Sequence, residues 1–336
     1  MKKFLVALLA GCMLFSLAAC SSTSSSVPAS TPASTPNSTP ASTPASTPES
    51  TPASTPATDG GDPITVGMLI YKYDDTYIST VRSAIETYTA ESATDITLDM
   101  QDGQGNQATQ NDQLDVLIQK GVDVILINAV DAGSGQGLAD KCIAAGIPFI
   151  FFNREPDHTV LQPLGEDGEP GDIVGLFVGT TASEAGVMQG DILADLWESR
   201  PETDLNGDGT CQYLVFKGEP GNPEAEARST YCVSEMEDRG IPGEDVNGAP
   251  LVANWMTDQA QSQMEAILGA KQGEIEAVYC NNDDMALGVI AALNSIGYNN
   301  GGMDEGNWIP VIGVDATDAG MAAVESGKMY GTVKQD

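Results

Sequence analysis

Between residues 64 and 333, short apolar runs alternate with longer amphipathic segments, and this alternation constrains the fold more than any other feature. An apolar run followed by a segment with helical spacing of its apolar side chains is typical of a βαβ unit, which builds a parallel sheet covered on both faces. The alternation pauses over the Gly-, Asp- and Glu-rich residues 157–172 and then resumes. We therefore predict an α/β protein with two doubly wound parallel-sheet lobes, over residues 62–178 and 179–333.

Each lobe has its own series of expected elements. In the first lobe we expect strands over 64–70, 96–100, 124–128, 148–152 and 174–178, and helices over 78–90, 110–120 and 138–145. In the second lobe we expect helices over 184–197, 224–239, 260–268, 285–296 and 319–326, and strands over 212–216, 251–254, 277–280, 310–314 and 330–333.

Several of the expected strands end in a planar polar side chain, namely Asn128, Asn153, Asn282 and Asp315. In doubly wound sheets, ligands bind beyond the carboxyl ends of the strands, where loops carry the functional groups. Any one of these residues would also be explained by an Asx turn or a helix N-cap. Because the series recurs in both halves of the chain, it indicates a binding site formed by both lobes.

The first twenty residues predict export. Lys2 and Lys3 precede an apolar run over 4–19, which is too short to span a membrane and typical of a signal peptide. The run ends in Leu17-Ala18-Ala19-Cys20, which resembles a bacterial lipobox. We expect residues 1–19 to be removed, Cys20 to carry a lipid, and the protein to be anchored to the outer face of the bacterial cytoplasmic membrane. The alternative is an ordinary signal peptide with an incidental cysteine.

Residues 20–61 form a low-complexity segment. Proline recurs at every fourth position from Pro28 to Pro56, among Ser, Thr and Ala. Such a segment buries no apolar surface that would compensate for the entropy of ordering, and regularly spaced proline favours an extended, semi-rigid chain. We expect a linker that holds the lobes away from the membrane.

The charge balance excludes several classes of function. The chain has 14 Lys and Arg against 48 Asp and Glu, for a net charge of −34, and such a chain repels nucleic acid. Its single histidine, His158, leaves little room for histidine-based catalysis or metal binding. An exported glycosidase with paired carboxylates is an open alternative, but among so many acids a suitable pair carries no information. No nucleophile, phosphate-loop or Cys-x-x-Cys motif is present, and we expect no enzymatic activity.

One segment matches a calcium loop. Oxygen-bearing residues stand at positions one, three, five, seven and nine of an EF-hand template, and Gly209 stands at position six, where the template turns sharply. These residues are Asp204, Asn206, Asp208, Thr210 and Gln212. The template fails at position twelve, where Val215 replaces the bidentate Glu. Calcium takes six to eight oxygens, so a carboxylate from elsewhere would have to complete the site. A solvated Asp/Asn/Gly turn is the alternative.

Eight short motifs, in order along residues 64–336, resemble bacterial galactose/glucose-binding proteins. They are 70–75 (IYKYDD), 110–113 (QNDQ), 128–131 (NAVD), 151–156 (FFNREP), 217–221 (KGEPG), 225–228 (AEAR), 281–283 (NND) and 312–315 (IGVD). The resemblance implies the type 1 periplasmic-binding-protein fold, in which a hinge joins two lobes around a sugar cleft. It also implies an ABC importer as partner, and it assigns the remote calcium carboxylate to Glu276.

The same resemblance implies which residues contact the sugar. Planar polar side chains that suit the hydroxyl edge of a pyranose fall on Asp75, Asn128, Arg228, Asn282 and Asp315, and aromatic rings that suit its faces fall on Tyr77 and Trp255. Three positions depart from the family's usual residues: Asn222 stands for His, Glu224 for Asp and Gln335 for Asn. Each departure keeps a polar group but changes its length or donor pattern, so the hexose preference stays open.

Further expectations concern the partners and the chain end. We expect a monomer that closes around a monosaccharide and docks on the importer permease, with presentation of the sugar to a chemoreceptor or sensor kinase as the alternative. We expect contact with the membrane only through the lipid, and we predict no disulfide.

In the family the chain returns into the first lobe after a strand matching 330–333. Residues 334–336 would begin that return, which implies a fragment whose first lobe lacks its closing elements.

Overall fold

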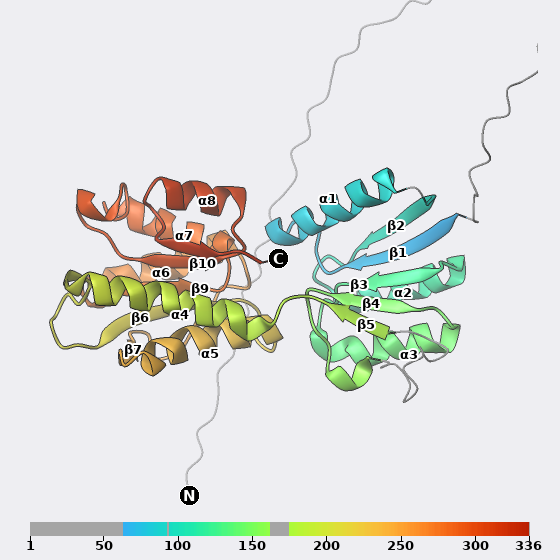
Figure 1. The fold of residues 1–336 in the computed structure, drawn as a ribbon, viewed down its shortest axis with the longest axis horizontal. Coiled ribbons are helices and arrows are strands. Elements are labelled where there is room, and N and C mark those ends of the chain that lie inside the picture. Colours follow the sequence, from blue (N-terminus) through green and yellow to red (C-terminus); the bar gives the residue numbers. More distant parts are fainter. Residues whose placement is uncertain (1–62, 93, 162–174, 336) are drawn as a thin grey trace, which may run out of the picture. The chain divides into compact units, whose positions relative to one another are not determined.

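The computed structural model describes residues 63–92, 94–161 and 175–335. The expected signal peptide, Cys20 and the proline-rich linker lie outside these residues, as do residues 162–174 of the acidic loop. Figure 1 shows the elements of both lobes along the chain.

The first five strands form one parallel sheet with the order β2-β1-β3-β4-β5. The strands are β1 (Ile64–Ile70), β2 (Ile96–Asp102), β3 (Val124–Ile127), β4 (Phe149–Phe152) and β5 (Gly175–Val178), and the helices are α1 (Thr76–Glu91), α2 (Gln107–Lys120) and α3 (Gly135–Ala145). Leu114 of α2 and Leu138 of α3 pack on one face of the sheet, whereas Ile78 of α1 packs on the other. The sheet therefore has helices on both faces.

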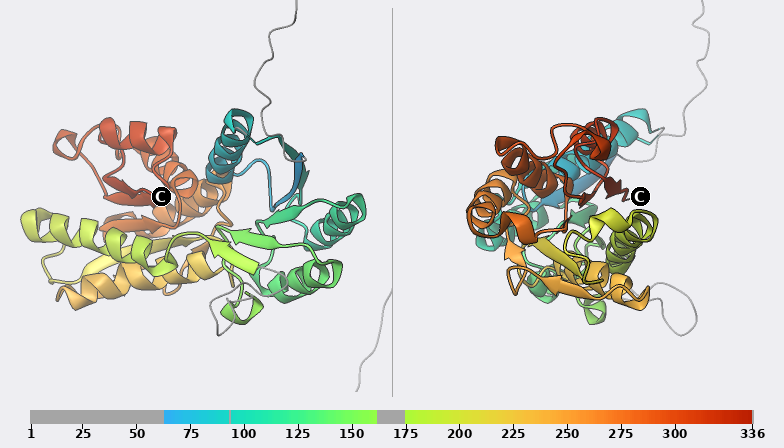
Figure 2. Two further views of the ribbon diagram at one scale, coloured as in Figure 1. Left: turned by 45° about the vertical axis from the view of Figure 1, so that its right-hand side comes forward. Right: turned by 90° about the vertical axis from the view of Figure 1, so that its left-hand side faces the viewer.

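The remaining strands form a second parallel sheet with the order β11-β10-β9-β6-β7, in which β8 also pairs with β6. The strands are β6 (Cys211–Lys217), β7 (Gly243–Asp245), β8 (Leu251–Val252), β9 (Ala277–Cys280), β10 (Val311–Val314) and β11 (Gly331–Val333). The helices are α4 (Ala182–Ser199), α5 (Pro223–Asp238), α6 (Thr257–Lys271), α7 (Asp283–Ser295) and α8 (Asp318–Glu325). Residues of α4 and α5 pack on one face and residues of α6, α7 and α8 on the other. Figure 2 shows these two layers from other sides.

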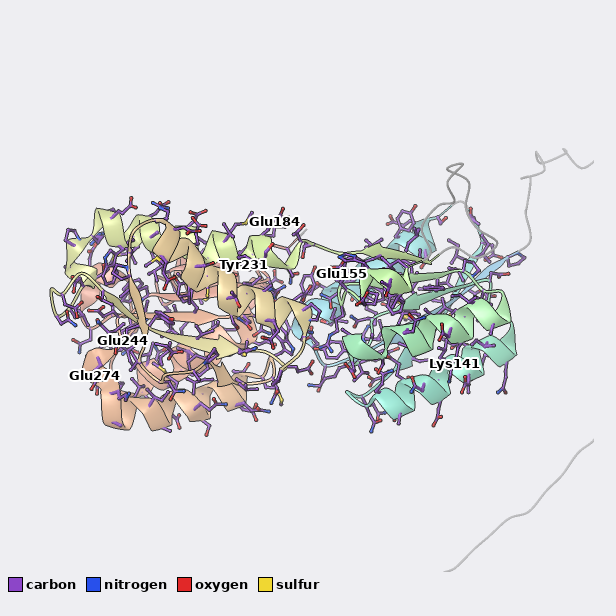
Figure 3. All side chains as sticks on the ribbon, turned by 90° about the horizontal axis from the view of Figure 1, so that it is seen from below. Lys141, Glu155, Glu184, Tyr231, Glu244 and Glu274 are labelled. Atoms are coloured by element: carbon purple, nitrogen blue, oxygen red, sulfur yellow. The ribbon has the colours of Figure 1, made fainter. Side chains whose placement is uncertain are left out.

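The predicted fold class is confirmed. Both sheets are parallel and both are covered on two faces, as βαβ repetition requires. Residues 179–181 connect β5 of the first sheet to α4 of the second lobe. Buried apolar side chains fill the space between sheet and helices, while charged residues such as Glu184, Glu244 and Glu274 are exposed on the outside of the second lobe (Figure 3).

The structure differs from the expected elements mainly at their ends. Helix α1 begins at Thr76 because the Asp75 side chain accepts a hydrogen bond from the backbone N–H of Ile78, and α2 begins at Gln107 because Asn106 caps it in the same way. Strand β7 was not predicted. It is an edge strand of three residues that pairs through its backbone with β6, and its sequence, Gly-Glu-Asp, has no apolar signal.

Four cysteines lie within the described residues, and each is a buried free thiol: Cys142, Cys211, Cys232 and Cys280. Burial raises the pKa of Cys142 to about 12, so its thiol stays protonated at neutral pH. In the part of the chain that the structure describes, no helix has the length and apolar character needed to cross a membrane.

Candidate functional site

A cavity lies where the carboxyl ends of the two sheets face each other. Every loop that reaches it follows a strand: β1, β4, β6, β8, β9, β10 or β11. The lining residues are Tyr71, Asp75, Tyr77, Ile78, Asn153, Arg154, Asn222, Glu224, Arg228, Trp255, Asn282, Asp315 and Gln335. This interlobe cavity is where a doubly wound fold is expected to bind a ligand.

Nine of the ten residues that we expected to contact a sugar line this cavity. They are Asp75, Tyr77, Asn222, Glu224, Arg228, Trp255, Asn282, Asp315 and Gln335. They are spread over 261 positions of sequence, from 75 to 335, and the two parallel sheets bring them together.

Asn128 is the one expected contact residue that the structure does not bring into the cavity lining. Asn128 does not line the cavity and is fully buried behind its wall. Its Oδ1 accepts from the backbone N–H of Tyr71 (3.2 Å), and its Nδ2 donates to Asn153 Oδ1 (3.1 Å) and to the Phe152 carbonyl (3.3 Å). These bonds occupy the amide, so Asn128 orients two cavity residues instead of facing the cavity itself.

Asp75 is held in place from two sides. Its Oδ1 accepts from the backbone N–H of Ile78 at 2.8 Å as the N-cap of α1, and its Oδ2 accepts from the hydroxyl of Tyr71. Tyr71 is 3% exposed, and burial, followed by the nearby Asp75 charge, raises the pKa of its phenol. The phenol therefore stays protonated and donates, which fixes the Asp75 carboxylate in one orientation.

A single buried guanidinium lies between two carboxylates. Arg228 is 2% exposed, and its Nη2 is 3.4 Å from Glu224 Oε2 while its Nη1 is 3.9 Å from Asp315 Oδ1. Nη1 also donates to the Asn281 carbonyl at 2.8 Å. Burial raises the pKa of both the Glu224 and the Asp315 carboxyl, and the charge of Arg228 opposes that rise. Arg228 therefore holds two buried carboxylate acceptors close together at the cavity.

Two helix caps from the second lobe also face the cavity. Asn222 caps α5 by accepting from the backbone N–H groups of Glu224 and Ala225, both at 3.0 Å. Asn282 caps α7 in the same way through Met285, and its Nδ2 donates to the Trp255 carbonyl at 3.3 Å. Capping explains the planar polar residues at these strand ends locally, and the same geometry places their side chains on the cavity wall.

The second lobe presents an indole to the cavity through a strained turn. Trp255 has φ of 65° and Asn254 has φ of 49°, a backbone region that side chains other than glycine rarely adopt. Gly218, after β6, makes room for the ring, because a Cβ there would lie 2.3 Å from two of its carbons. Among the described residues, Trp255 Nε1 and Arg228 Nε are buried donors without a hydrogen-bond partner.

Three lining residues were not predicted, namely Tyr71, Ile78 and Arg154, whereas Asn153 belongs to the predicted series of strand-end residues. A sequence signal existed for two of these three, since Tyr71 lies inside the IYKYDD motif and Arg154 inside the FFNREP motif. Tyr71 and Ile78 carry no polar pattern of their own. They reach the cavity because Asp75, which lies between them in sequence, caps α1 there.

The expected calcium residues are gathered at one end of β6. Glu276 is 3% exposed, and its two carboxylate oxygens accept from the backbone N–H groups of Leu205 (2.6 Å) and Gln212 (3.0 Å). Burial raises the pKa of its carboxyl. Asn206 Nδ2 donates to Asp208 Oδ2 (3.0 Å) and to Gln212 Oε1 (3.2 Å), so these side-chain oxygens already converge on one donor.

The donor set fits calcium by its chemistry. All of its members bear oxygen, and a buried carboxylate that contacts only backbone N–H groups is stabilised by a nearby cation. Within residues 63–92, 94–161 and 175–335, no three Asp, Glu, His or Cys side chains surround one point as metal ligands. Binding would therefore require Asn206 to turn its oxygen inward and the loop carboxylates to draw together.

Comparison with known proteins identifies relatives along most of the chain. The family description "Periplasmic binding protein domain" matches residues 66–336. The chain is similar to a D-galactose/methyl-galactoside binding periplasmic protein of Haemophilus influenzae, with 35% identity over 81% of this chain and 76% of that protein. It is also similar to a putative rhizopine-binding protein of Rhizobium meliloti, with 29% identity over 81% of this chain and 79% of that one.

A solved structure shares the fold. The chain is similar to an ABC transporter solute binding protein from Bacillus halodurans with bound myo-inositol, with a TM-score of 0.67 and 27% identity. The match covers 83% of this chain and 85% of that one.

Proposed function

This chain belongs to the periplasmic binding protein family, and we propose that it binds one pyranose hexose, galactose or glucose, in the interlobe cavity and delivers it to an ABC importer. As a sugar-binding member of that family it is an exported binding protein and not an enzyme. Its relatives differ in the polyol that their names give, from galactose to rhizopine and xylitol, so the choice of hexose rests on the cavity.

The observation that carries the proposal is the set of groups that line the cavity from both lobes. Carboxylates from Asp75, Glu224 and Asp315 accept hydrogen bonds, and the amides and Arg228 donate them, which suits the alternating hydroxyls at the edge of a sugar ring. Tyr77 and Trp255 supply aromatic surface that suits the C–H faces of the ring.

Calorimetric titration tests this proposal. We expect galactose or glucose to bind with one site per chain, and ribose, xylose and myo-inositol to bind at least about tenfold more weakly, because a wrong polyol leaves buried polar groups unpaired. Trp255→Ala should weaken hexose binding by about tenfold or more through loss of the ring contact. If neither hexose gives a saturable heat while another polyol does, the hexose assignment is wrong.

We further propose that the protein works by closure of its lobes around the sugar. Both lobes line the cavity, so a bound sugar contacts both and favours the conformation in which they are together. The importer would then recognise the closed form. Reconstituted transport should therefore require both the sugar and this protein, and a chemoreceptor pull-down would distinguish the alternative of presentation to a sensor.

A structural calcium ion at Asp204, Asn206, Asp208, Thr210, Gln212 and Glu276 is part of the proposal. Calcium would stabilise the end of β6 by neutralising the buried Glu276 carboxylate and the loop carboxylates. We expect a chelator to lower the melting temperature of the wild type and to leave that of Glu276→Gln unchanged. The exposed Glu274→Gln is the matched control and should respond as the wild type does. An unchanged wild-type melting temperature would remove the calcium ion from the proposal.

The lipid anchor on Cys20 is likewise a proposal, since Cys20 lies outside the described residues. Expressed in a bacterium, the wild type should partition with membranes and carry the mass of a lipid on its N-terminal peptide. Cys20→Ala should lose both properties, whereas Cys12→Ala, inside the signal segment, should keep them. A soluble, unmodified wild type would contradict the anchor.

A further inference from the structure

We propose that Arg154 is a positioning residue that locks the second lobe onto the first through Glu219 and so sets how long the sugar stays bound. This inference rests on the proposed function as a sugar-binding protein that closes. Arg154 belongs to the first lobe, directly after β4, and Glu219 belongs to the second lobe, in the loop after β6. Arg154 Nη2 lies 2.9 Å from Glu219 Oε2.

The first lobe holds the Arg154 side chain by itself. Its guanidinium carbon lies 3.6 Å from the centre of the Tyr71 ring, and Nη1 donates to the Val130 carbonyl at 2.6 Å. The side chain is 4% exposed. These contacts all come from the first lobe, so they persist when the lobes separate. Arg154 is therefore fixed in position before the second lobe arrives, and closure requires little further ordering.

Glu219 links this ion pair to the cavity. The carbonyl of Glu219 accepts from the backbone N–H of Asn222 at 3.2 Å, and Asn222 caps α5 and lines the cavity. The side chain of Glu219 is 35% exposed, so the pair is partly shielded from water. When Arg154 holds Glu219, the loop that presents Asn222 and Glu224 is held against the first lobe.

On the other side, Arg154 acts on Asp75 through Tyr71. The Tyr71 ring lies under the guanidinium, and its hydroxyl donates to the Asp75 carboxylate. The contacts therefore run from Glu219 through Arg154 and Tyr71 to Asp75, from one lobe to the other along the cavity wall. A second cross-lobe hydrogen bond, from Thr76 Oγ1 to Asp284 Oδ2 at 2.7 Å, involves none of these groups, so closure does not depend on Arg154 alone.

The Arg154–Glu219 pair exists only when the lobes are together. Its free energy therefore stabilises the closed form and not the open one. Its loss should speed opening, and hence sugar release, and should leave the stability of the ligand-free protein unchanged. Partly buried pairs fall between exposed and fully desolvated ones, and we expect Glu219→Gln to raise the hexose Kd about five- to twentyfold. The increase should lie in the dissociation rate, because the encounter of a neutral sugar does not depend on this charge.

A double-mutant cycle tests the inference. Glu219→Gln, Arg154→Met, the double variant and the control Glu198→Gln are compared by calorimetry and by stopped-flow tryptophan fluorescence. Glu198 pairs with Arg239 inside the second lobe, so its variant should match the wild type. We expect the double variant to bind no more weakly than Arg154→Met, and Glu219→Asp to restore part of the wild-type dissociation rate. The melting temperature of ligand-free Glu219→Gln should equal that of the wild type.

Two outcomes overturn the inference: a wild-type dissociation rate in Glu219→Gln with hexose still bound, or fully additive effects in the double variant. Failure of the proposed function looks different, because the wild type itself would then bind no sugar. In that case the inference falls together with the proposed function, because it concerns the release of a bound sugar.

Discussion

At the residue scale, two buried carboxylates of the interlobe cavity share one buried guanidinium. Arg228 is 2% exposed and is shared between Glu224 and Asp315, both of which are also buried. A buried ion pair contributes little relative to apolar packing, but removal of one partner leaves an uncompensated charge. The arrangement therefore serves recognition more than stability. It holds carboxylate acceptors in place for sugar hydroxyls, and the charge of Arg228 compensates for their burial.

Arg228→Met should be severely disruptive. We expect it to lower the free energy of unfolding by about 3 kcal/mol, since two buried carboxylates lose their counter-charge, and to weaken hexose binding by at least about a hundredfold. Urea unfolding and calorimetry measure the two effects. Arg200→Met, which removes an exposed pair with Asp304 and Glu202, is the control and should change neither. A variant with normal affinity would show that Arg228 does not contact the ligand.

The pH dependence should have opposite signs for stability and for binding. Burial raises the pKa of Asp315 and of Glu224 above their ordinary values of 3.8 and 4.5, so the folded protein binds protons more readily than the unfolded chain. Their contribution to the stability of the ligand-free protein therefore falls as pH rises through the window between the ordinary and the raised values. Sugar binding needs the ionised acceptors and should weaken as pH falls through the same window.

Calorimetry and urea unfolding across a pH series check this expectation, with Asp315→Asn as the test variant. The variant should bind sugar poorly at every pH and should lose part of the pH dependence of ligand-free stability. An identical pH dependence in the wild type and the variant would contradict the assignment to Asp315.

At the element scale, close approach between helices supports the second lobe. Gly288 of α7 faces α6, and a Cβ at this position would lie 2.1 Å from the Thr257 carbonyl oxygen. The glycine therefore allows the two helices to pack backbone to backbone beneath Asn282, the cavity residue that caps α7. The position of this site residue depends on packing that leaves no polar signal in the sequence.

Gly288→Ala should push α6 and α7 apart. We expect a loss of about 1–3 kcal/mol in the free energy of unfolding, the usual effect of overpacking, together with weaker hexose binding. Gly269→Ala is the matched control, because a Cβ at this position of α6 would meet no neighbouring element or side chain within 4 Å. That change should be neutral or should stabilise the protein by about 0.5–1 kcal/mol. Equal effects of the two substitutions would contradict the packing argument.

At the scale of the whole molecule, the net charge of −34 affects stability more than recognition. The acidic side chains repel one another across a folded surface, and salt screens this repulsion over a Debye length of about 10 Å at 0.1 M. A neutral sugar has no net charge, so the net charge of the protein neither attracts nor repels it. Stability and affinity should therefore respond differently to ionic strength.

We expect the melting temperature to rise by a few degrees between 10 mM and 200 mM KCl at constant calcium, while the hexose Kd changes less than about twofold. Differential scanning fluorimetry and calorimetry measure the two quantities on the same sample. A melting temperature independent of salt would show that the acids are locally compensated. A strongly salt-dependent Kd would indicate a charged ligand.

Only the strand-end residues Asn153, Asn282 and Asp315 followed from the residue pattern alone, whereas the other expected contacts came from the resemblance to a family. Asp75, Asn222 and Asn282 are helix caps, and caps follow strands in a βαβ chain. Asn128 is also a strand-end asparagine but lies behind the cavity wall, because its amide bonds to neighbouring backbone. Tyr71 lies in the IYKYDD motif, but its role was not predicted, because that role comes from contacts with Arg154 and Asp75.

By itself, the sequence determined that the chain builds two parallel sheets and which residues end their strands, because periodicity and capping are local properties of the backbone. It also predicted the calcium residues, the linker and the lipid on Cys20, which stay predictions. Only the tertiary structure decided which polar residues face the cavity and which stand behind it, and that Arg154 of one lobe meets Glu219 of the other. Those facts depend on distances between segments far apart in the chain, and such distances are set by packing.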